Sequence, residues 1–589
     1  MKPITFVRSV TERFRRRTPT SAQHNDFRQF AVFAGWGRQF GPVRRHDPHR
    51  TLDNEGAVRL GSYGDLGHLA NIAARFPRRR GISRVRGLVV LCAVLTACLA
   101  ERGPFTNRMA HSGTRYLARA ARQPVSWQPW GRDAFALAAK LDRPVLLYIG
   151  SDACRWCAET DRAIYTDPEI GSLINALFVP IRVDRDERPE VAQRYQAAVE
   201  RLAGLHGWPL TVFLTADGSP FFGGTYFPGD DPITGRGLKQ LLPEIAKRYR
   251  DQRPFIVQQA ALLRQLVLTT GESRGVLRAT LIRQGIDTLT RDLKDAVAAR
   301  TTAGSVMHAA AASLLLTEYA RDRDSAALTV ARRALDLMLD TTAIAIAEDP
   351  PRLVRAALVG SLAKAWVVTG ESRYRDAGRA LVRDLSHELH DLAALTGDGA
   401  VFADQEGFII ENLILAAATL GEPSVEKRAR AALDVLLQRT YARGWGVRHA
   451  IAGGSATSTL QGLLQDQVQV AAACLGAHQI SNEPRYLAVA IDLAAIVERG
   501  YADSIGGYFD SAEPPPGLGD RTKHVFDDML PGPNAEAARL LARLAEVTGD
   551  ASYRRRAQAT LEAFAGTVGG TGLRATTFLA AARETLGTP

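Results

Sequence analysis

Short apolar runs and helical apolar patterns alternate along the chain between residues 124 and 270. Continuous apolar runs bounded by turn residues are typical of buried strands, whereas apolar residues three or four apart indicate one face of a helix. The expected strands are 144–149, 178–184, 210–214 and 221–227, the last two joined at the Asp217-Gly218 turn. The expected helices are 134–141, 189–203 and 238–250. This order predicts an α/β thioredoxin-like domain over 124–270.

After residue 275 the pattern becomes helical, and a short turn sequence recurs between apolar-periodic helices. In the clear copies Gly or Asn ends one helix, and Ser or Pro helps to begin the next. One further copy is weaker. The copies are Thr369-Gly-Glu-Ser-Arg-Tyr374, Leu420–Val425, Ser481–Tyr486, Thr548–Tyr553 and, more weakly, Arg321–Ser325. They are roughly 50–70 residues apart, longer than common solenoid periods. This spacing predicts helical hairpins that close into an all-α, α/α toroid over 275–589.

The composition is that of a globular protein, with 46% apolar and 23% charged residues in 589. Five cysteines in this length exclude a disulfide-stapled scaffold. The net charge of +12 resides entirely in residues 1–86, which hold 18 Lys and Arg against 6 Asp and Glu. The remaining chain is neutral and offers no basic face for a polyanion, so we expect no nucleic-acid partner.

The first hundred residues suggest export. Residues 1–86 lack a sustained apolar period, and we interpret them as a basic disordered leader that is not translated, with an RNA-binding arm as the alternative. Residues 87–100 contain a 13-residue apolar run after Arg84 and Arg86, typical of a signal peptide and too short to span a bilayer. Its alternative is a short buried helix. Leu95-Thr-Ala-Cys98 resembles a bacterial lipoprotein box, which predicts lipidation of Cys98 and a linker over 101–123.

The chemistry of the first domain is expected at Cys154-Arg-Trp-Cys157, which follows a strand and opens a helix. The helix N-terminus and the charge of Arg155 favour a thiolate at Cys154. Cys157, one turn further, can close a disulfide and expel a bound substrate. A structural disulfide and half of a zinc site are the alternatives, but we expect no metal and no cofactor. Cys474 lies in an apolar helix and is interpreted as a core residue.

A substrate platform is expected at Gly207-Trp208-Pro209, just before a strand. Proline accepts a cis peptide bond at low cost, and a cis bond here would turn the Trp208 backbone toward the cysteines. We therefore assign Trp156, Trp208 and Pro209 to substrate binding. The alternative is an ordinary strand-start proline.

Several long motifs now make a family resemblance visible. They are Pro124–Trp130, the Cys-Arg-Trp-Cys segment, Val183–Pro189, Gly207–Leu214 and Phe221–Pro228. Together they resemble the YyaL-like thioredoxin-domain family, and the resemblance implies a thioredoxin-like domain fused to an α/α toroid of the six-hairpin epimerase and glycosidase type. The family usually reads Cys-His-Trp-Cys-His, so Arg155 and Ala158 replace both histidines.

The resemblance also implies a polar site in the toroid. The residues assigned to it are Asp466, Asp510, Arg521, Lys523, Asp527 and Asn534. The alternative interpretation is that these side chains form ion pairs and caps that hold loops together. The family's His-Phe-Glu-Lys-Met helix and Asp-Ala-Asp-Ser-Glu loop have no counterpart between 340 and 450.

The sequence therefore predicts an exported thiol–disulfide oxidoreductase of the periplasm or cell envelope, tethered to the membrane through Cys98. Its expected partner is a protein thiol or disulfide, with a toroid that binds a client or ligand. One alternative is a carbohydrate-active toroid with an accessory thioredoxin domain and a carbohydrate ligand. Another is a non-catalytic interaction protein with a structural disulfide.

Overall fold

A computed structural model describes most of the chain after residue 104. The described ranges are 105–230, 236–269, 272–300, 305–345, 352–389, 400–452 and 462–587. The leader, the apolar segment at 87–100 and Cys98 therefore lie outside the described residues. Within the described residues no helix combines the length and apolar character needed to cross a bilayer.

The first domain is built on a five-stranded mixed sheet. Its strands are β1 (Gln128–Pro129), β2 (Val145–Gly150), β3 (Val179–Asp184), β4 (Leu210–Leu214) and β5 (Pro220–Gly224). They lie in the order β1-β3-β2-β4-β5, with β2 parallel to β3 and antiparallel to β4. This arrangement confirms the predicted thioredoxin-like order, although the last strand ends earlier than the expected 221–227.

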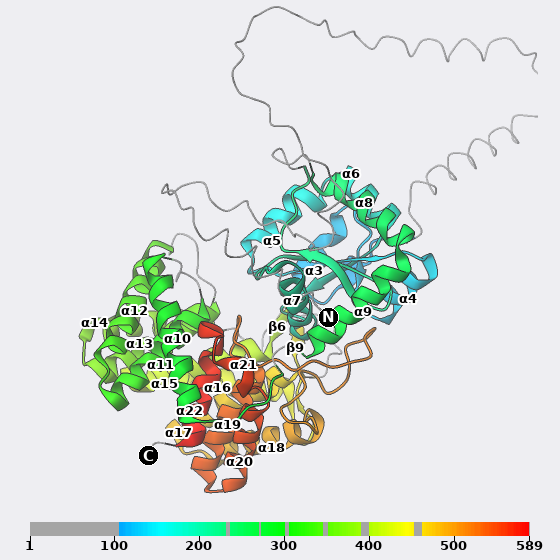
Figure 1. The fold of residues 1–589 in the computed structure, drawn as a ribbon. Coiled ribbons are helices and arrows are strands. Elements are labelled where there is room, and N and C mark those ends of the chain that lie inside the picture. The colour runs from blue at the N-terminus through cyan, green and yellow to red at the C-terminus, as the bar shows by residue number, and fades with distance from the viewer. Residues whose placement is uncertain are drawn as a thin grey trace, which may run out of the picture.

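Helices cover both faces of this sheet (Figure 1). Val145, Leu147 and Ile149 of β2 pack with α4 (Arg132–Leu141) and α7 (Pro189–Ala203). The alternate residues Leu146 and Tyr148 belong to the opposite core, because successive side chains of a strand point to opposite faces. That core is covered by α6 (Pro168–Leu177) and α8 (Leu238–Asp251), and α9 (Arg253–Leu268) reaches both cores.

The predicted linker over 101–123 is wrong for residues 105–123. This segment forms η1 (Met109–His111), α3 (Arg115–Arg119) and η2 (Ala120–Arg122), and Met109, Tyr116 and Leu117 are buried in the α/β domain. The Asn107 amide donates to the carbonyls of Ala120 and Val125, which holds the segment as a compact turn. Helices of three to five residues are too short to show an apolar period, so the sequence gives no signal for them.

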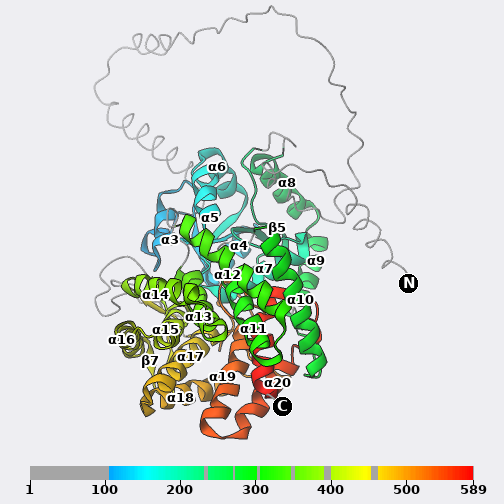
Figure 2. The ribbon, with the colours of Figure 1, turned by 90° about the vertical axis from the view of Figure 1, so that its left-hand side faces the viewer.

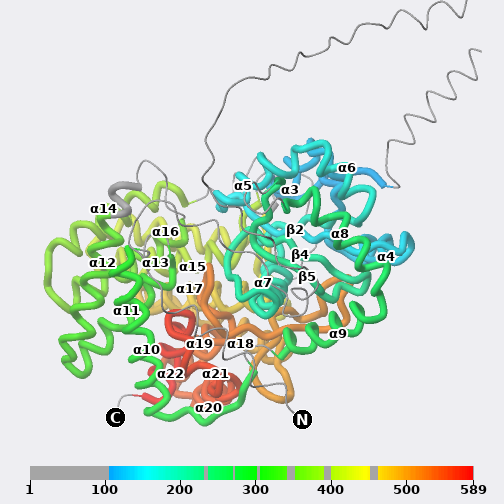
Figure 3. The backbone as a smooth tube through the Cα atoms, turned by 45° about the horizontal axis from the view of Figure 1, so that its top comes forward, coloured from blue at the N-terminus to red at the C-terminus, as the bar shows by residue number. Residues whose placement is uncertain are grey.

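The second domain is a closed ring of helical hairpins. Its inner helices are α11 (Val306–Asp322), α13 (Arg352–Thr369), α15 (Ala403–Leu420), α17 (Leu464–Ser481), α19 (Pro533–Thr548) and α22 (Thr576–Leu586). The outer helices are α10 (Ala279–Ala298), α12 (Ser325–Ala345), α14 (Ser372–His387), α16 (Pro423–Thr440), α18 (Pro484–Gly500) and α20 (Ala551–Glu562). Each inner helix contacts the next, and α22 contacts α11, so the ring closes (Figure 3). The described residues thus confirm the predicted six-hairpin α/α toroid.

The two ends of the toroid differ in their connections. The recurring turn sequences join inner to outer helices and form the short-turn end, as predicted. Each of these turns contains one residue with a positive φ. These residues are Arg323, Gly370, Gly421, Asn482 and Gly549. Longer connections at the other end, the long-loop end, carry the small elements of the domain. These are β6 (Ala400–Phe402), β7 (Tyr441–Ala442), β8 (Gly446–Val447), β9 (Ala450–Ala452), α21 (Ala565–Val568) and η4 (Gly572–Ala575).

The α/β domain docks on the long-loop end of the toroid, and Figure 2 shows it lying against one end of the ring. Asp520, in the loop between α18 and α19, pairs with Arg194 at 2.5 Å and with Arg264 at 2.8 Å. Glu200 of α7 pairs with Arg574 at 2.9 Å. These ion pairs contribute to the contact between the two domains.

The left-handed turns give a test of the toroid's construction. Gly549 has a φ of 74° with open space around its Cα, so Gly549→Ala introduces only backbone strain. We expect it to lower the free energy of unfolding by about 1 kcal/mol. Gly500, at the end of α18, also faces open space but has no positive φ. Gly500→Ala should be neutral or stabilising, and urea denaturation followed by circular dichroism compares the two; equal losses would contradict the assignment.

Candidate redox and interdomain sites

Cys154 and Cys157 form a disulfide at the N-terminus of α5 (Arg155–Thr160). Cys154 is the N-cap residue and is partly exposed, whereas Cys157 is buried in the first turn. The Sγ of Cys154 accepts the backbone N–H of Cys157 at 3.1 Å. An N–H donor and the positive end of the helix both stabilise negative charge at this sulfur, so the geometry favours Cys154 as the attacking thiolate.

A buried carboxyl group lies on the same side of the sheet as Cys157. Gly150 is paired in register with Asp184, and paired residues of parallel strands project to the same face. In the direction of a Gly150 side chain the nearest atoms are the Tyr116 hydroxyl and the Cys157 Sγ. Burial, followed by the charge of Asp186, raises the pKa of Asp184 to about 7. Asp184 can therefore exchange a proton near neutral pH on the face of the sheet that carries the resolving cysteine.

A partly buried ion pair anchors the redox helix to the sheet. Asp161 begins η3 (Asp161–Tyr165), a single π-helical turn that continues α5. Both of its oxygens accept hydrogen bonds from Arg182 of β3, at 2.7 and 2.6 Å. Arg182 is 1% exposed, and its guanidinium lies 4.3 Å from the ring centre of Tyr116 and 5.0 Å from that of Tyr148. This pair fixes the position of the cysteine helix relative to the sheet.

The three predicted substrate-binding residues lie in two different settings. Trp156 follows Arg155 in α5 and is 53% exposed, a position open to a protein client. The Trp208–Pro209 bond is cis, and β4 begins at the next residue, paired with the last residues of β2. The cis peptide therefore lies beside the end of β2, where the loop that carries the cysteines begins. The Trp208 indole, however, lines a pocket between the domains, with the Arg185 guanidinium 5.4 Å from its ring centre.

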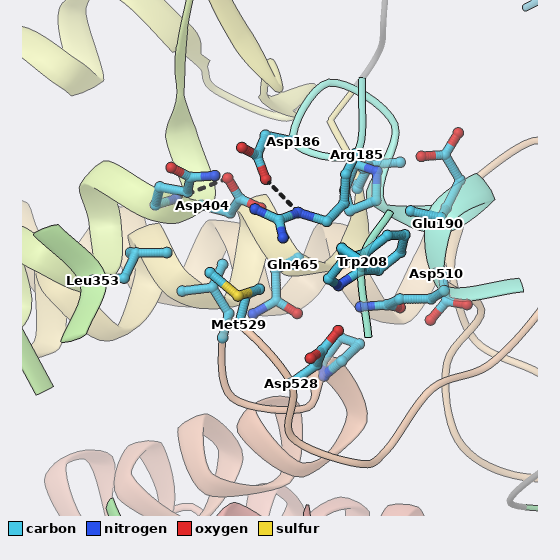
Figure 4. A pocket seen from close by; sticks show the side chains of 17 residues that line it. Arg185, Asp186, Glu190, Trp208, Leu353, Asp404, Gln465, Asp510, Asp528 and Met529 are labelled. Carbon is cyan, nitrogen blue, oxygen red and sulfur yellow. Dashed lines mark hydrogen bonds and ion pairs between the residues drawn. The ribbon is translucent and has the colours of Figure 1, made fainter. Parts of the chain in front are cut away.

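We call this space the interdomain pocket (Figure 4). Arg185, Glu190 and Trp208 of the α/β domain face Asp404, Gln465 and Asp510 of the toroid. Its volume of about 60 Å³ has room for a few water molecules but is far below the roughly 300–1,000 Å³ of typical ligand sites. The pocket is therefore best described as a polar joint between the domains.

The centre of this joint is His449. Its Nδ1 lies 2.9 and 3.1 Å from the two carboxylate oxygens of Asp466, and its Nε2 lies 2.9 Å from the backbone carbonyl of Asp186. All three side chains involved, His449, Asp466 and the adjacent Asp404, are buried. Burial alone would lower the pKa of His449, but the Asp466 carboxylate outweighs it and raises the pKa to about 10. His449 is thus an imidazolium that ties the toroid to the α/β domain.

Asp404, His449 and Asp466 also place three oxygen and nitrogen atoms within 4.8 Å of one another, a spacing that could hold a metal ion. The donor set argues against it. The Nε2 of His449 faces a carbonyl oxygen, to which it must donate a proton, and its Nδ1 faces a carboxylate. Neither nitrogen keeps a lone pair for a metal, so the trio fits an ion pair better than a metal centre.

The carboxyl groups predicted for a toroid site serve structural contacts. Asp466 accepts the backbone N–H groups of Leu463 and Asp404 in addition to its bond with His449. Asp510 accepts from the backbone and ring of His524. Asp527 accepts from the backbone N–H groups of Gly532 and Thr577. Asp510 alone of the six lines the interdomain pocket.

The other three predicted toroid residues hold the α18–α19 loop. Arg521 donates to the Ala512 carbonyl at 2.9 Å, and Lys523 pairs with Asp503 at 2.7 Å. Asn534 bonds the backbone of Tyr508 through both atoms of its amide. The structure does not bring the six into one pocket, and their contacts are the loop-holding ion pairs and caps of the alternative interpretation.

Fold and site define a thioredoxin-like domain with a Cys-x-x-Cys disulfide, joined to an α/α toroid. Residues 106–267 match the family model described as "Thioredox_DsbH: Protein of unknown function, DUF255", so this domain belongs to that thioredoxin-like family and the predicted resemblance is confirmed.

Curated relatives and solved structures each resemble only part of this chain. The chain is similar to Spermatogenesis-associated protein 20 of Homo sapiens, at 35% identity over 28% of this chain and 21% of that protein. The Mus musculus protein of the same name is 34% identical over 30% of this chain and 22% of that protein. The matched segment thus spans about a fifth of these relatives. A crystal structure of an unsaturated glucuronyl hydrolase specific for heparin is similar at 13% identity and a TM-score of 0.39, over 49% of this chain and 85% of that one.

Several residues of these sites are absent from the sequence-based prediction. Asp184 ends an apolar strand parallel to the one before the cysteines, and that position is a recognisable signal for a residue near them. Arg182 and Asp161 are charged residues that become neighbours only through the sheet. His449 lies in a connection without a periodic pattern, so nothing in the sequence points to it.

A second histidine at the joint yields a pH-dependent prediction. His206 lies 2.8 Å from Glu200 and 3.8 Å from Asp528 of the toroid. Hydrogen bonds to Asp528 and then Glu200 raise its pKa from 6.5 to about 9. A raised folded-state pKa stabilises the protein below pH 6.5, and that contribution is lost as pH rises to about 9.

We therefore expect His206→Gln to lower the melting temperature at pH 6 and to have little effect above pH 9. Melting curves of the unchanged protein and of His206→Gln, recorded at intervals of half a pH unit, measure the difference between their melting temperatures. Taking this difference cancels the contributions of the other titrating groups. A difference that does not change with pH would contradict a charged His206 at the joint.

Proposed function

We propose that the chain is a thiol–disulfide oxidoreductase that acts on a protein client through Cys154 and Cys157. The observation that carries this proposal is the Cys154–Cys157 disulfide at the N-terminus of α5, in which Cys154 is partly exposed and Cys157 is buried. A structural disulfide needs no such asymmetry. An exchange reaction requires it, because one sulfur must be accessible to the client disulfide while the other stays protected until it attacks the mixed disulfide.

The exchange runs in two balanced steps. The Cys154 thiolate attacks one sulfur of a client disulfide, forming a mixed disulfide and releasing the other client sulfur as a thiolate. The Cys157 thiolate then attacks Cys154, which re-forms the intramolecular disulfide and releases the second client thiolate. Asp184 accepts the Cys157 proton before this attack. An external dithiol must reduce the pair for each further turnover, and the reverse sequence oxidises a client dithiol.

Export and membrane attachment complete the proposal. The apolar run at 88–100 after two arginines and the Leu95–Cys98 box support secretion, with acylation of Cys98 as the tether. Such a location also suits a disulfide-exchanging pair, because exported compartments are oxidising. The six-hairpin toroid would carry the client or a further ligand beside the redox domain. Labelling with palmitate that is lost in Cys98→Ala, together with globomycin-sensitive cleavage before Cys98, tests the tether; labelling that persists in Cys98→Ala would contradict it.

The redox proposal is tested with the two single cysteine variants of residues 105–589. Cys157→Ser should trap a mixed disulfide with a client through Cys154, whereas Cys154→Ser should trap none and lose insulin-reductase turnover by at least 100-fold. Non-reducing electrophoresis and an insulin turbidity assay give the readouts. Equal trapping by both variants would contradict the assigned roles of the two sulfurs.

The reduction potential separates an exchanging pair from a structural disulfide. Working oxidoreductases lie between about −270 and −120 mV, and structural disulfides below about −300 mV. Thiol trapping across a glutathione series measures the value for Cys154 and Cys157. A potential below about −300 mV would mean that the proposal is wrong.

Asp184→Asn tests the proton acceptor. The substitution removes a group able to take the Cys157 proton, so we expect resolution of the mixed disulfide to slow about tenfold or more near pH 7. Stopped-flow tryptophan fluorescence of mixed-disulfide decay gives the rate and its pH profile. Asp217→Asn, in the β4–β5 turn of the same domain, is the matched control and should leave the rate unchanged. An unaltered rate and pH profile in Asp184→Asn would exclude the role.

A further inference from the structure

A long cavity runs inside the ring of inner helices, and we call it the axial cavity. Its volume is about 470 Å³, within the roughly 300–1,000 Å³ typical of small-molecule sites. Its lining on α11 extends from Met307 to Thr317, which corresponds to about 15 Å along the helix. Among the described residues, none lines both this cavity and the interdomain pocket. The axial cavity is therefore a second space, and it is large enough for a ligand.

The axial cavity opens at the short-turn end of the toroid. Thr317, Val367 and Thr419 line it in the last two turns of α11, α13 and α15, and all three are exposed. Val367 is 67% exposed and marks the rim of the opening. The α/β domain docks on the opposite, long-loop end, so a ligand would enter from the face away from the redox domain.

Three neighbouring inner helices give the cavity an apolar wall. The branched aliphatic, methionine and phenylalanine side chains that line it all belong to α11, α13 and α15, and they are Val306, Met307, Leu314, Val367, Phe408 and Leu415. Alanines of the same helices complete this wall. Moving apolar carbon from water onto such a surface is favourable in proportion to the area that is buried. The cavity therefore favours a ligand with an apolar body.

Among the described residues, the charged side chains that line the axial cavity have, with one exception, partners within the protein. Asp527 accepts two backbone N–H groups. The others form ion pairs, which are Glu411 with Arg543 at 2.6 Å, Arg539 with Glu584 at 3.1 Å and with Glu536 at 3.6 Å, and Arg583 with Glu318 at 2.6 Å. Because these groups already have counter-charges, they do not select for a charged ligand.

The exception is Lys364 of α13, which is exposed to the cavity near its opening. Its ammonium donates to the Thr317 hydroxyl at 2.9 Å, and no described carboxylate forms an ion pair with it. An ammonium has three N–H donors, so two remain for a bound group. Burial, followed by the charge of Arg539, lowers the pKa of Lys364 to about 8. An anion beside Lys364 would stabilise the charged form that these surroundings disfavour.

One unmatched cation beside an apolar wall defines the charge of the ligand. A carboxylate would accept both remaining N–H groups of Lys364 through its two oxygens. A second negative charge would find no unpaired cation among the described lining residues. A cationic ligand would be repelled by Lys364 and Arg539. The cavity therefore fits a monoanion with an apolar body.

We propose that the axial cavity binds a monocarboxylate with an apolar body, such as a medium-chain fatty acid or an arylalkanoate. Its carboxylate would lie on Lys364 at the opening, and its apolar part would lie against α11, α13 and α15. The proposal goes beyond the redox function and does not depend on it, because the site is in the other domain and opens at the opposite end. It also differs from the predicted toroid site, of which Asp527 alone lines this cavity.

Titration calorimetry and saturation-transfer NMR on the full chain test the ligand class with probes of equal length. We expect octanoate to bind once per chain with a dissociation constant of about 1 mM or lower. Octan-1-ol, octylamine, the dicarboxylate suberate and the sugar acid glucuronate should each bind about tenfold more weakly or less. Hexanoate should bind roughly 15-fold more weakly than octanoate, because each buried CH₂ contributes about fourfold. Comparison of octanoate with 3-phenylpropionate separates an aliphatic from an aryl source of the carboxylate.

Substitutions at the opening test the assigned cation. Lys364→Met keeps an unbranched side chain but removes the charge, so it should weaken octanoate binding about tenfold or more and leave that of octan-1-ol unchanged. Lys364→Arg keeps the charge and should retain most of the affinity. Lys427→Met is the matched control, because Lys427 is an exposed lysine of the outer helix α16 that does not line the cavity. This control and Cys154→Ser should both bind octanoate normally.

A second readout observes the lysine directly. Reductive methylation with ¹³C-formaldehyde preserves the charge of each of the eight lysines, and the Lys364 signal is assigned by its absence from Lys364→Arg. Octanoate should shift this signal and leave that of Lys427 in place. A Lys364 signal that does not move, unchanged affinity in Lys364→Met, or octan-1-ol, octylamine or glucuronate binding as tightly as octanoate would overturn the proposal. Failure of both octanoate and 3-phenylpropionate to bind would overturn it as well.

Discussion

The arrangement of the two domains depends on one buried imidazolium. His449 links the Asp466 carboxylate at the start of α17 to the Asp186 carbonyl just after β3, and both His449 and Asp466 are fully buried. Removing one partner of such a pair typically costs 3–5 kcal/mol, because the other charge is left buried and unmatched. The pair therefore acts as an alignment device: the domains can approach in one register, in which the histidine reaches both acceptors.

A similar device operates inside the α/β domain. Arg182 projects from the sheet into a group of aromatic rings and meets Asp161, which directly follows the cysteine helix. Because the guanidinium forms two parallel hydrogen bonds, it fixes the direction of the helix as well as its distance. The chemistry of the outer sulfur depends on that direction, since the helix N-terminus must point at Cys154 for its dipole to act there.

The sequence predicts regular structure well and charged contacts poorly. The strands 178–184 and 210–214, the helix 189–203 and all five hairpin turns follow from local patterns, because periodicity and turn residues act over a few positions. The Cys154–Cys157 pair is found for the same reason. His449 and Arg182 acquire their roles from residues far along the chain, and no local pattern carries that information. The linker prediction for residues 105–123 is wrong because their helices are shorter than a detectable period.

The closed ring also bears on how the protein is made. Arg583 of α22 pairs with Glu318 of α11 at 2.6 Å, across 265 residues of sequence, and Glu200 meets Arg574 across 374. At roughly 5–20 residues per second, the ribosome needs about 15–60 s to extend the chain from the α/β domain to these partners. During that interval the first domain can fold alone, while the apolar inner helices await the last one. The toroid therefore closes, and covers the apolar faces of its inner helices, only after its final helix has emerged.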